Sequence, residues 1–128
     1  MSVVISEQLG ERAMPASERT VFDEEEVLIT YVRRRGGKAK SIPVWFTVKD
    51  GKMELLPMYG LKTRWYADVE ASGKIGLAIK GWRREAKPDI VKEARVIEGI
   101  KGRFGAKYGF SNVKKYYPTS EVALEVPV

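Results

Sequence analysis

The chain has 128 residues, 44% of them hydrophobic, which is enough for one domain with a sizeable core. It contains no histidine and no cysteine, which excludes disulfides, ordinary zinc sites, haem held by a proximal histidine and histidine-based catalytic triads. The net charge is +6, but residues 1–26 carry −5, so the remainder carries +11. A basic body of this kind favours phosphorylated ligands, nucleic acid or acidic membranes as partners.

These exclusions narrow the chemistry and the location of the protein. We expect no metal and no haem, so any catalysis relies on carboxylate, tyrosine, lysine or arginine side chains or on an organic cofactor. No apolar run is long enough to span a membrane, and no signal pattern opens the chain. We therefore expect a cytoplasmic protein that has no membrane partner.

The N-terminal region differs from the rest of the chain in composition. Residues 1–22 are polar and are interrupted by Gly10 and Pro15, which predicts a loosely held arm. Residues 23–128 form the predicted domain. Its first strand is predicted at Val27–Val32, where β-branched and aromatic residues are concentrated.

A basic turn follows this strand. Five cations lie between Arg33 and Lys40, around the pair Gly36-Gly37. One interpretation is a hairpin tip whose charge serves solubility. The other is an anion clamp, because glycine permits close backbone approach and arginine forks match phosphate oxygens. We favour the clamp.

The next two strands are predicted at Lys40–Val48 and Met53–Tyr59. Asp50-Gly51 between them is a strong hairpin signal, since glycine supplies the positive φ of a tight turn. Pro43 lacks an amide proton, which predicts an edge, a bulge or a ligand-facing position. The second of these strands is apolar on both faces, so we expect it to be central in its sheet.

A helix is predicted at Leu61–Ser72. Leu61, Trp65 and Val69 recur at intervals of four, and Gly73 suits the position just after the helix. Lys62 and Thr63 would then lie near the helix N-terminus, where the backbone amides favour an anion.

The remaining elements are predicted from the alternation of apolar and polar residues and from proline and glycine residues, which interrupt helices and strands. Strands are expected at 74–80, 82–87 and 122–126. A long helix is expected to begin at Pro88, and a shorter one to cover 111–115.

The order of these elements resembles the FMN-binding split-barrel superfamily, the pyridoxamine-phosphate-oxidase-like group, over residues 27–126. Residues 34–43 resemble the GR-x-SG-x-xR-x-x-P segment of its deazaflavin-dependent nitroreductase branch, and residues 65–73 resemble the WY-x-N-L-x-A-N-P segment. Lys40 stands in place of an arginine of that branch, and Asp68 in place of an asparagine. Lys62 matches the lysine of the K-x-x-N-L loop found in FMN-binding relatives, so both cofactors stay open.

The resemblance implies a mainly β, α+β fold, namely a six-stranded antiparallel split β-barrel with two or three flanking helices. It also implies a homodimer with the cofactor near the subunit interface. Carried over by position, the candidates for binding the cofactor phosphate are Arg34, Lys38, Lys40 and Lys62. The candidates for approaching the ring or the ribityl chain are Ser41, Pro43, Met58, Tyr59, Gly60 and Thr63, and Trp65 is a candidate wall for a planar ligand.

The favoured function is that of an oxidoreductase that transfers a hydride to or from a small organic substrate. Its cofactor is expected to be FMN, or alternatively the deazaflavin coenzyme, with a nicotinamide or another small molecule as the second substrate. One alternative is a flavin-binding protein of the same fold without turnover. Another is a small-barrel nucleic-acid binder, which the basic body favours, although the chain has no RNA-recognition or helix-turn-helix pattern.

Overall fold

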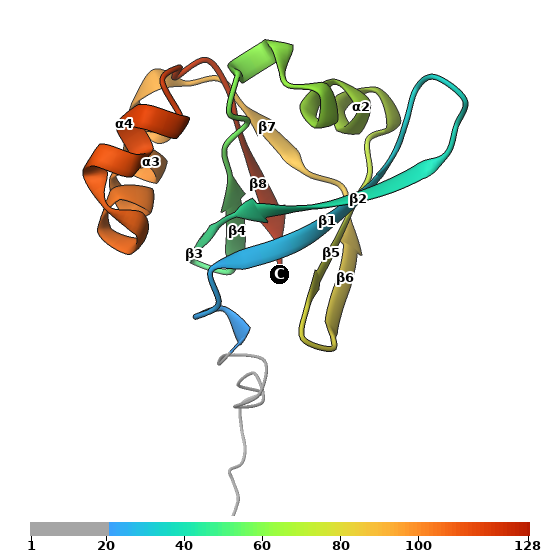
Figure 1. Cartoon of the computed structure of the whole chain (residues 1–128), viewed down its shortest axis with the longest axis horizontal. Helices are drawn as coiled ribbons and strands as arrows, with labels where there is room; N and C mark the ends of the chain where they lie inside the picture. Colours follow the sequence, from blue (N-terminus) through green and yellow to red (C-terminus); the bar gives the residue numbers. More distant parts are fainter. Residues whose placement is uncertain (1–20) are drawn as a thin grey trace, which may run out of the picture.

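Two antiparallel sheets of four strands each form the body of the protein (Figure 1). The computed structural model describes residues 21–128. The first sheet has the order β2-β1-β5-β6 and contains β1 (Glu26–Val32), β2 (Ala39–Trp45), β5 (Ile75–Ile79) and β6 (Trp82–Ala86). The second has the order β3-β4-β8-β7 and contains β3 (Thr47–Lys49), β4 (Lys52–Leu55), β7 (Asp89–Val91) and β8 (Ala123–Pro127).

Three α-helices and one 3-10 turn complete the described part of the chain. They are the turn η1 (Gly60–Lys62), α2 (Arg64–Ser72), α3 (Ala94–Tyr108) and α4 (Phe110–Tyr116). Figure 1 shows α3 and α4 side by side at one end, with α2 beside the β1–β2 hairpin at the other. The mainly β, α+β class and the three flanking helices are confirmed, but the six strands predicted for the split barrel are wrong, because the described part of the chain has eight strands in two sheets of four. No helix within residues 21–128 is long and apolar enough to cross a membrane.

The strand predicted at 40–48 is in fact two strands, and the chain passes from one sheet to the other between them. Phe46, fully buried, separates β2 from β3. Its N–H donates to the hydroxyl oxygen of Tyr108 at 3.1 Å, and its carbonyl accepts from Lys107 Nζ at 3.0 Å. Helix α3 thus satisfies backbone groups that a neighbouring strand would otherwise bond, and the strand can break without leaving them unpaired.

Two further boundaries differ from the prediction. The strand predicted at 53–59 ends at Leu55, and the following residues lead into η1. Asp89–Val91, expected to open a helix after Pro88, instead pairs with β8 as an edge strand, and α3 begins at Ala94. Alternation and helical periodicity cannot be told apart over three residues, so pairing with β8 decided this segment.

Other local predictions are confirmed. Asp50 and Gly51 both have positive φ, 52° and 76°, as a tight hairpin turn between β3 and β4 requires. Strand β4 is internal to its sheet, and Pro43 lies on the edge strand β2. Gly73 ends α2 in the left-handed conformation.

The core fills the space between the sheets and under the helices. The inward residues Val27, Ile29 and Tyr31 of β1 are buried together with Trp65 and Val69 of α2. A second cluster lies under α3 and α4, and its buried residues are Leu56, Ile97, Ile100, Phe104, Val113, Tyr117 and Ala123. Val21 also belongs to the core, and Phe22 meets Trp82 edge-on at 5.2 Å, whereas the rest of the predicted arm lies outside the described residues.

A buried ion pair ties α3 to the second sheet. Glu54 of β4 has a side chain only 3% exposed, and it accepts hydrogen bonds from Arg103 Nε at 2.8 Å and from Arg103 Nη2. The hydroxyl of Thr47 donates to the same carboxylate at 2.7 Å. The hydrogen bonds to Glu54 raise the pKa of Arg103 above its ordinary value, so the guanidinium group keeps its charge.

Arg103→Ala tests this tie. The substitution leaves a buried carboxylate with one hydroxyl donor, so we expect the free energy of unfolding to fall by about 3 kcal/mol. Urea titration measures this loss. Lys52→Ala is the control, because its pair with Glu125 at 3.7 Å is exposed to solvent and should cost less than about 1 kcal/mol. Equal small losses in both variants would show that the Glu54–Arg103 pair contributes no more than a surface pair.

Candidate functional site

A cavity of about 710 Å³ lies beside β2, between the segment that leads into α2 and the end of α4. Alternate residues of β2, namely Lys40, Ile42 and Val44, line one side, together with Pro43 and Trp45. The opposite side is formed by the η1 region and the start of α2, and the C-terminal end of α4 contributes Tyr116 together with the residue that follows the helix, Tyr117. The lining residues from these two parts are Leu56, Met58, Tyr59, Lys62, Thr63, Arg64, Trp65, Tyr116 and Tyr117.

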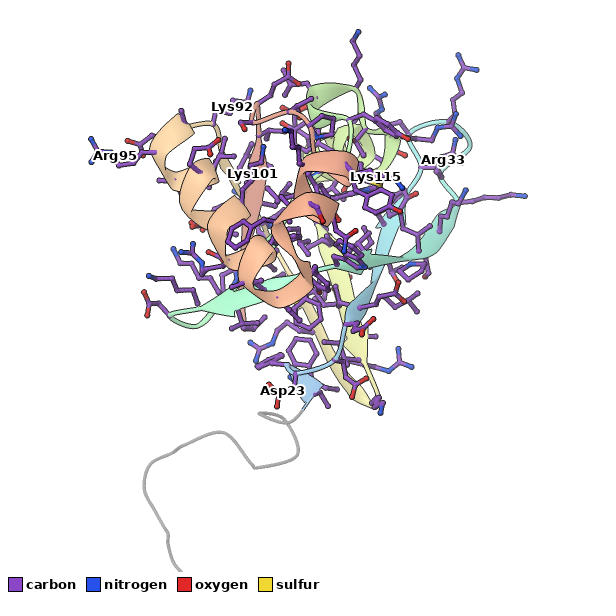
Figure 2. All side chains as sticks on the ribbon, turned by 60° about the vertical axis from the view of Figure 1, so that its left-hand side comes forward. Asp23, Arg33, Lys92, Arg95, Lys101 and Lys115 are labelled. Atoms are coloured by element: carbon purple, nitrogen blue, oxygen red, sulfur yellow. The ribbon has the colours of Figure 1, made fainter. Side chains whose placement is uncertain are left out.

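Two hydrogen bonds to side-chain oxygens hold the turn that carries Lys62, one from within the turn and one from the C-terminal loop. Thr63 Oγ1 accepts from the N–H of Tyr59 at 2.8 Å, and Glu121 Oε1 accepts from the N–H of Leu61 at 3.1 Å. Lys101 of α3, labelled in Figure 2, donates to the carbonyl of Thr119 at 3.3 Å in the same C-terminal loop as Glu121. The position of Lys62 is therefore set through α3 and this loop as well as by the local turn.

Gly60 is the point of closest approach in this turn. Its φ is +62°, and a Cβ atom there would lie 2.1 Å from Glu121 Oε1 and 2.8 Å from Thr119 Oγ1. Only glycine fits this position without displacing Glu121.

An aromatic wall closes the cavity on the α4 side. Trp45 stacks on Tyr108 with ring centroids 4.1 Å apart and planes within 6° of parallel. Tyr116 meets the same indole edge-on at 5.8 Å, and Tyr117 approaches it at 6.0 Å. Planar, largely apolar walls of this kind suit an aromatic ligand.

Two tyrosines of this wall, Tyr108 and Tyr117, are neutral at ordinary pH. Burial raises the pKa of Tyr108 to about 12, and burial also raises the pKa of Tyr117. The Tyr108 hydroxyl donates to the backbone carbonyl of Glu25, which fixes the ring. Charge in the cavity therefore comes from Lys40, Lys62 and Arg64, against the single carboxylate of Glu26.

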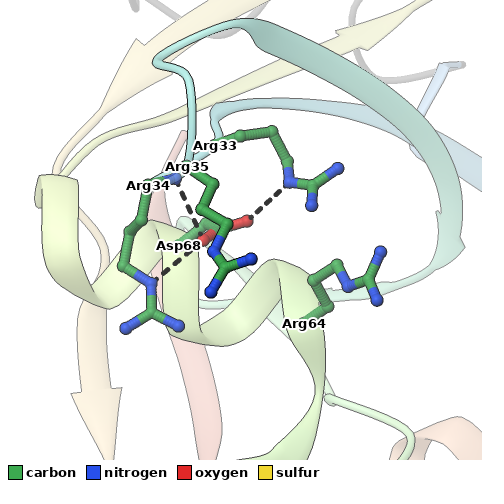
Figure 3. Close-up of a pocket in the computed structure, with 5 residues that line it drawn as sticks. All are labelled: Arg33, Arg34, Arg35, Arg64 and Asp68. Atoms are coloured by element: carbon green, nitrogen blue, oxygen red, sulfur yellow. Dashed lines mark hydrogen bonds and ion pairs between the residues drawn. The ribbon is translucent and has the colours of Figure 1, made fainter.

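The structure brings most of the predicted site residues together. Those that line the cavity are Lys40, Pro43, Met58, Tyr59, Lys62, Thr63 and Trp65. Gly60 lies in the same turn, whereas Ser41 pairs with Thr30 through their hydroxyls at 2.8 Å, and Lys38 is exposed near the hairpin tip. Arg34 lies in a second hollow with Asp68, shown in Figure 3.

Several lining residues were missed by the sequence analysis. Trp45, Tyr116 and Tyr117 form the aromatic wall, and Arg64 borders both hollows. The tyrosine pair before Pro118 was a visible signal, but only the packing of α4 beside β2 makes it part of the site. Among residues 21–128, no group of three or more acidic side chains could hold a metal ion.

The fold that surrounds this cavity is the predicted split-barrel fold, and several solved structures share it. A reductase described as F420-H2-dependent has a TM-score of 0.62 at 15% identity, over 80% of this chain and 93% of its own. The predicted resemblance is thereby confirmed at the level of the fold. No protein-family profile matches the sequence. No curated protein sequence matches it either.

Two other solved structures share this fold. The conserved hypothetical protein Rv2991 from Mycobacterium tuberculosis has a TM-score of 0.70 at 14% identity, over 88% of this chain and 79% of its own. HutZ, the heme storage protein from Vibrio cholerae, has a TM-score of 0.68 at 8% identity, over 88% of both chains. One fold thus carries a reductase and a storage protein, so function has to be argued from the cavity.

Gly60→Ala tests the contact that holds the turn. We expect a loss of about 2–3 kcal/mol in the free energy of unfolding, because backbone strain is added to displacement of Glu121. Gly73→Ala is the matched control, since its φ is +75° and a Cβ there would meet no atom within 4 Å. It should lose only the strain, about 1–2 kcal/mol. Thermal and urea unfolding of both variants measure the difference, and equal losses would contradict a role for Glu121.

Proposed function

We propose that the protein is an oxidoreductase that holds FMN, or alternatively the deazaflavin coenzyme, in the cavity beside β2. The observation that carries the proposal is the combination of an aromatic wall with two lysines in one cavity of about 710 Å³. This volume lies within the usual range for small-molecule and cofactor sites, about 300–1,000 Å³. A planar ring needs apolar walls, and a phosphate needs cations, so the lining fits the group.

The lining suggests how the chain would hold such a cofactor. Lys40 and Lys62, on opposite sides of the cavity, would pair with the phosphate. The residues that would contact the ring or the ribityl chain are Pro43, Met58, Tyr59, Thr63 and Trp65. Arg34 and Lys38 lie outside this lining, so we assign the phosphate to the two lysines.

The chemistry of the reaction would come from the cofactor. The bound ring supplies hydride transfer, and the protein supplies orientation, charge and exclusion of water. A site without histidine is compatible with this division of roles. The reductase among the proteins of this fold supports the proposal. Haem ligation by histidine is not open to this chain, because the sequence contains none.

A storage or carrier role is the second candidate, and the similarity of the fold to HutZ favours it. Turnover distinguishes the two. The oxidoreductase should consume NAD(P)H or reduced deazaflavin in the presence of an electron acceptor, whereas a storage protein should bind the cofactor without consuming either donor. Mass spectrometry of the ligand that co-purifies would identify the cofactor.

Lys40→Ala and Lys62→Ala test the assignment of the phosphate. Each variant loses a charge-assisted contact worth about 1.5–3 kcal/mol, so FMN should bind about 10- to 150-fold more weakly. Titration calorimetry with FMN, and with the deazaflavin coenzyme if FMN fails, gives the affinities. Lys49→Ala is the control and should bind like the parent, because Lys49 lies at the end of β3 and is not part of the cavity lining. If all three variants bind the cofactor as tightly as the parent does, Lys40 and Lys62 do not bind its phosphate.

We also propose that the protein is a homodimer that uses the outer face of the first sheet. On β1, β2 and β5 this face presents small and aliphatic residues, and the register places Leu28 beside Pro43 and Ala78, and Val32 beside Ala39. Leu28 is 43% exposed and Val32 is 47% exposed. Pro43 belongs both to this face and to the cavity lining, so a second copy seated here would lie next to the cofactor site.

Leu28→Glu tests the dimer. Two-fold symmetry would bring the new carboxylates of both copies into one apolar interface, so we expect the variant to be monomeric. Light scattering at micromolar concentration measures the mass of the parent and the variant. Leu61→Glu, at a residue 46% exposed on η1, is the control and should stay dimeric. A monomeric parent would contradict the proposal.

A further inference from the structure

A second hollow, of about 520 Å³, lies between the β1–β2 turn and α2 (Figure 3). Its lining is unlike that of the cavity beside β2, because four of its five residues are arginines and none is apolar. They are Arg33, Arg34, Arg35 and Arg64, with Asp68 as the fifth. The lining therefore carries a net charge of +3.

Asp68 holds two of these arginines in place. It is 4% exposed, and its Oδ1 accepts from the backbone N–H of Arg34 at 3.3 Å and from Arg34 Nε at 3.2 Å. Its Oδ2 lies 3.4 Å from Arg33 Nε without forming a hydrogen bond to any described group. Because both contacts use Nε, the terminal nitrogens remain available, and Figure 3 shows them extending away from the carboxylate.

The turn itself brings three consecutive arginines to one place. The N–H of Arg33 donates to the carbonyl of Lys38 at 2.9 Å, and the N–H of Gly37 donates to the carbonyl of Arg33 at 3.1 Å. Gly36 and Gly37 both have positive φ, 82° and 65°, which lets the chain curl this tightly. The arginines are thus arranged by backbone geometry as well as by Asp68.

The charges of this cluster are not balanced within residues 21–128. Asp68 compensates one of four guanidinium groups, and Arg35 and Arg64 have no ion pair with any described acid. Like charges held this close repel one another, so an external anion would stabilise the arrangement. The planar guanidinium fork matches pairs of phosphate oxygens, and it does so better than an ammonium group.

We propose that this arginine hollow is a second anion site, separate from the cofactor cavity, and that it takes a diphosphate group. A single phosphate carries about −1.5 to −2 at neutral pH, which is less than the net charge of +3 in the lining. Arg64 lines both hollows, so a diphosphate bound here lies directly beside the cavity. A nucleoside diphosphate or the diphosphate of a nicotinamide dinucleotide carries this chemistry.

Titration calorimetry with inorganic pyrophosphate, on the protein without added flavin, tests the site. We expect the parent to bind pyrophosphate, and Arg35→Ala to bind it at least about tenfold more weakly. Arg95→Ala is the control, because Figure 2 shows Arg95 on α3 at the opposite side of the molecule from Arg33, and it should bind like the parent. No binding by the parent, or equal weakening in both variants, would overturn the proposal.

Two further measurements separate a built site from a diffuse positive field. Arg35→Lys keeps the charge but loses the fork, so its affinity should fall between those of the parent and Arg35→Ala. If Arg35→Lys binds pyrophosphate as tightly as the parent does, the guanidinium fork is not what recognises the anion. FMN affinity of Arg35→Ala should equal that of the parent, whereas joint loss of FMN and pyrophosphate binding would show one site rather than two.

Repeating the titrations with ADP and with NADP⁺ identifies the source of the diphosphate. Tighter binding of either nucleotide than of pyrophosphate, abolished by Arg35→Ala, assigns the hollow to that ligand. The pyrophosphate result does not depend on the proposed flavin chemistry. Failure of the arginine site and failure of the oxidoreductase proposal can therefore be told apart.

Discussion

The arrangement of the whole molecule depends on how the chain passes through Phe46. At this residue β2 of the first sheet ends, and Thr47 begins β3 of the second. A buried backbone that leaves one ladder must find other partners, and here Tyr108 and Lys107 of α3 supply them. The same contact sets Trp45 against Tyr108. The contacts between Phe46 and α3 therefore fix three things together, namely the break between the sheets, the position of α3 and the aromatic wall of the cavity.

The two hollows differ in the kind of ligand group that their side chains suit. The cavity beside β2 is bounded by rings and aliphatic side chains with a few cations among them, while the neighbouring hollow is almost purely guanidinium. Asp68 maintains this division, since it holds Arg33 and Arg34 on the α2 side of the hairpin. Lys40, two residues beyond Lys38 in the chain, lines the cavity. An asparagine at position 68 would carry no charge to hold the arginines, so the residue that departs from the nitroreductase pattern has a structural consequence.

The fold by itself does not select the chemistry. Proteins with this arrangement include a reductase and a heme storage protein at 15% and 8% identity, so the sheets are a frame on which different sites are built. What distinguishes this chain is the content of its cavity. It offers planar walls, two opposed lysines and no histidine, and these properties belong to a group of side chains from β2, the η1 region and α4.

The sequence by itself determined the features that depend on neighbouring residues. The Asp50-Gly51 hairpin, the glycine that ends α2, the position of β1 and the absence of histidine chemistry follow from propensity, periodicity and composition. Most of the predicted site residues also proved to share one cavity, because β2 and the η1 turn carry them at short spacing. Only the tertiary structure decided the break at Phe46, the pairing of Asp89–Val91 with β8, the place of Tyr116 and Tyr117 in the wall, and the capture of Arg34 by Asp68. Each of these rests on contacts between segments far apart in the chain, 62 residues for Phe46 and Tyr108 and 34 for Arg34 and Asp68. Local pattern contains no information about which distant donor will satisfy a buried backbone group or a buried carboxylate, so packing alone makes that choice.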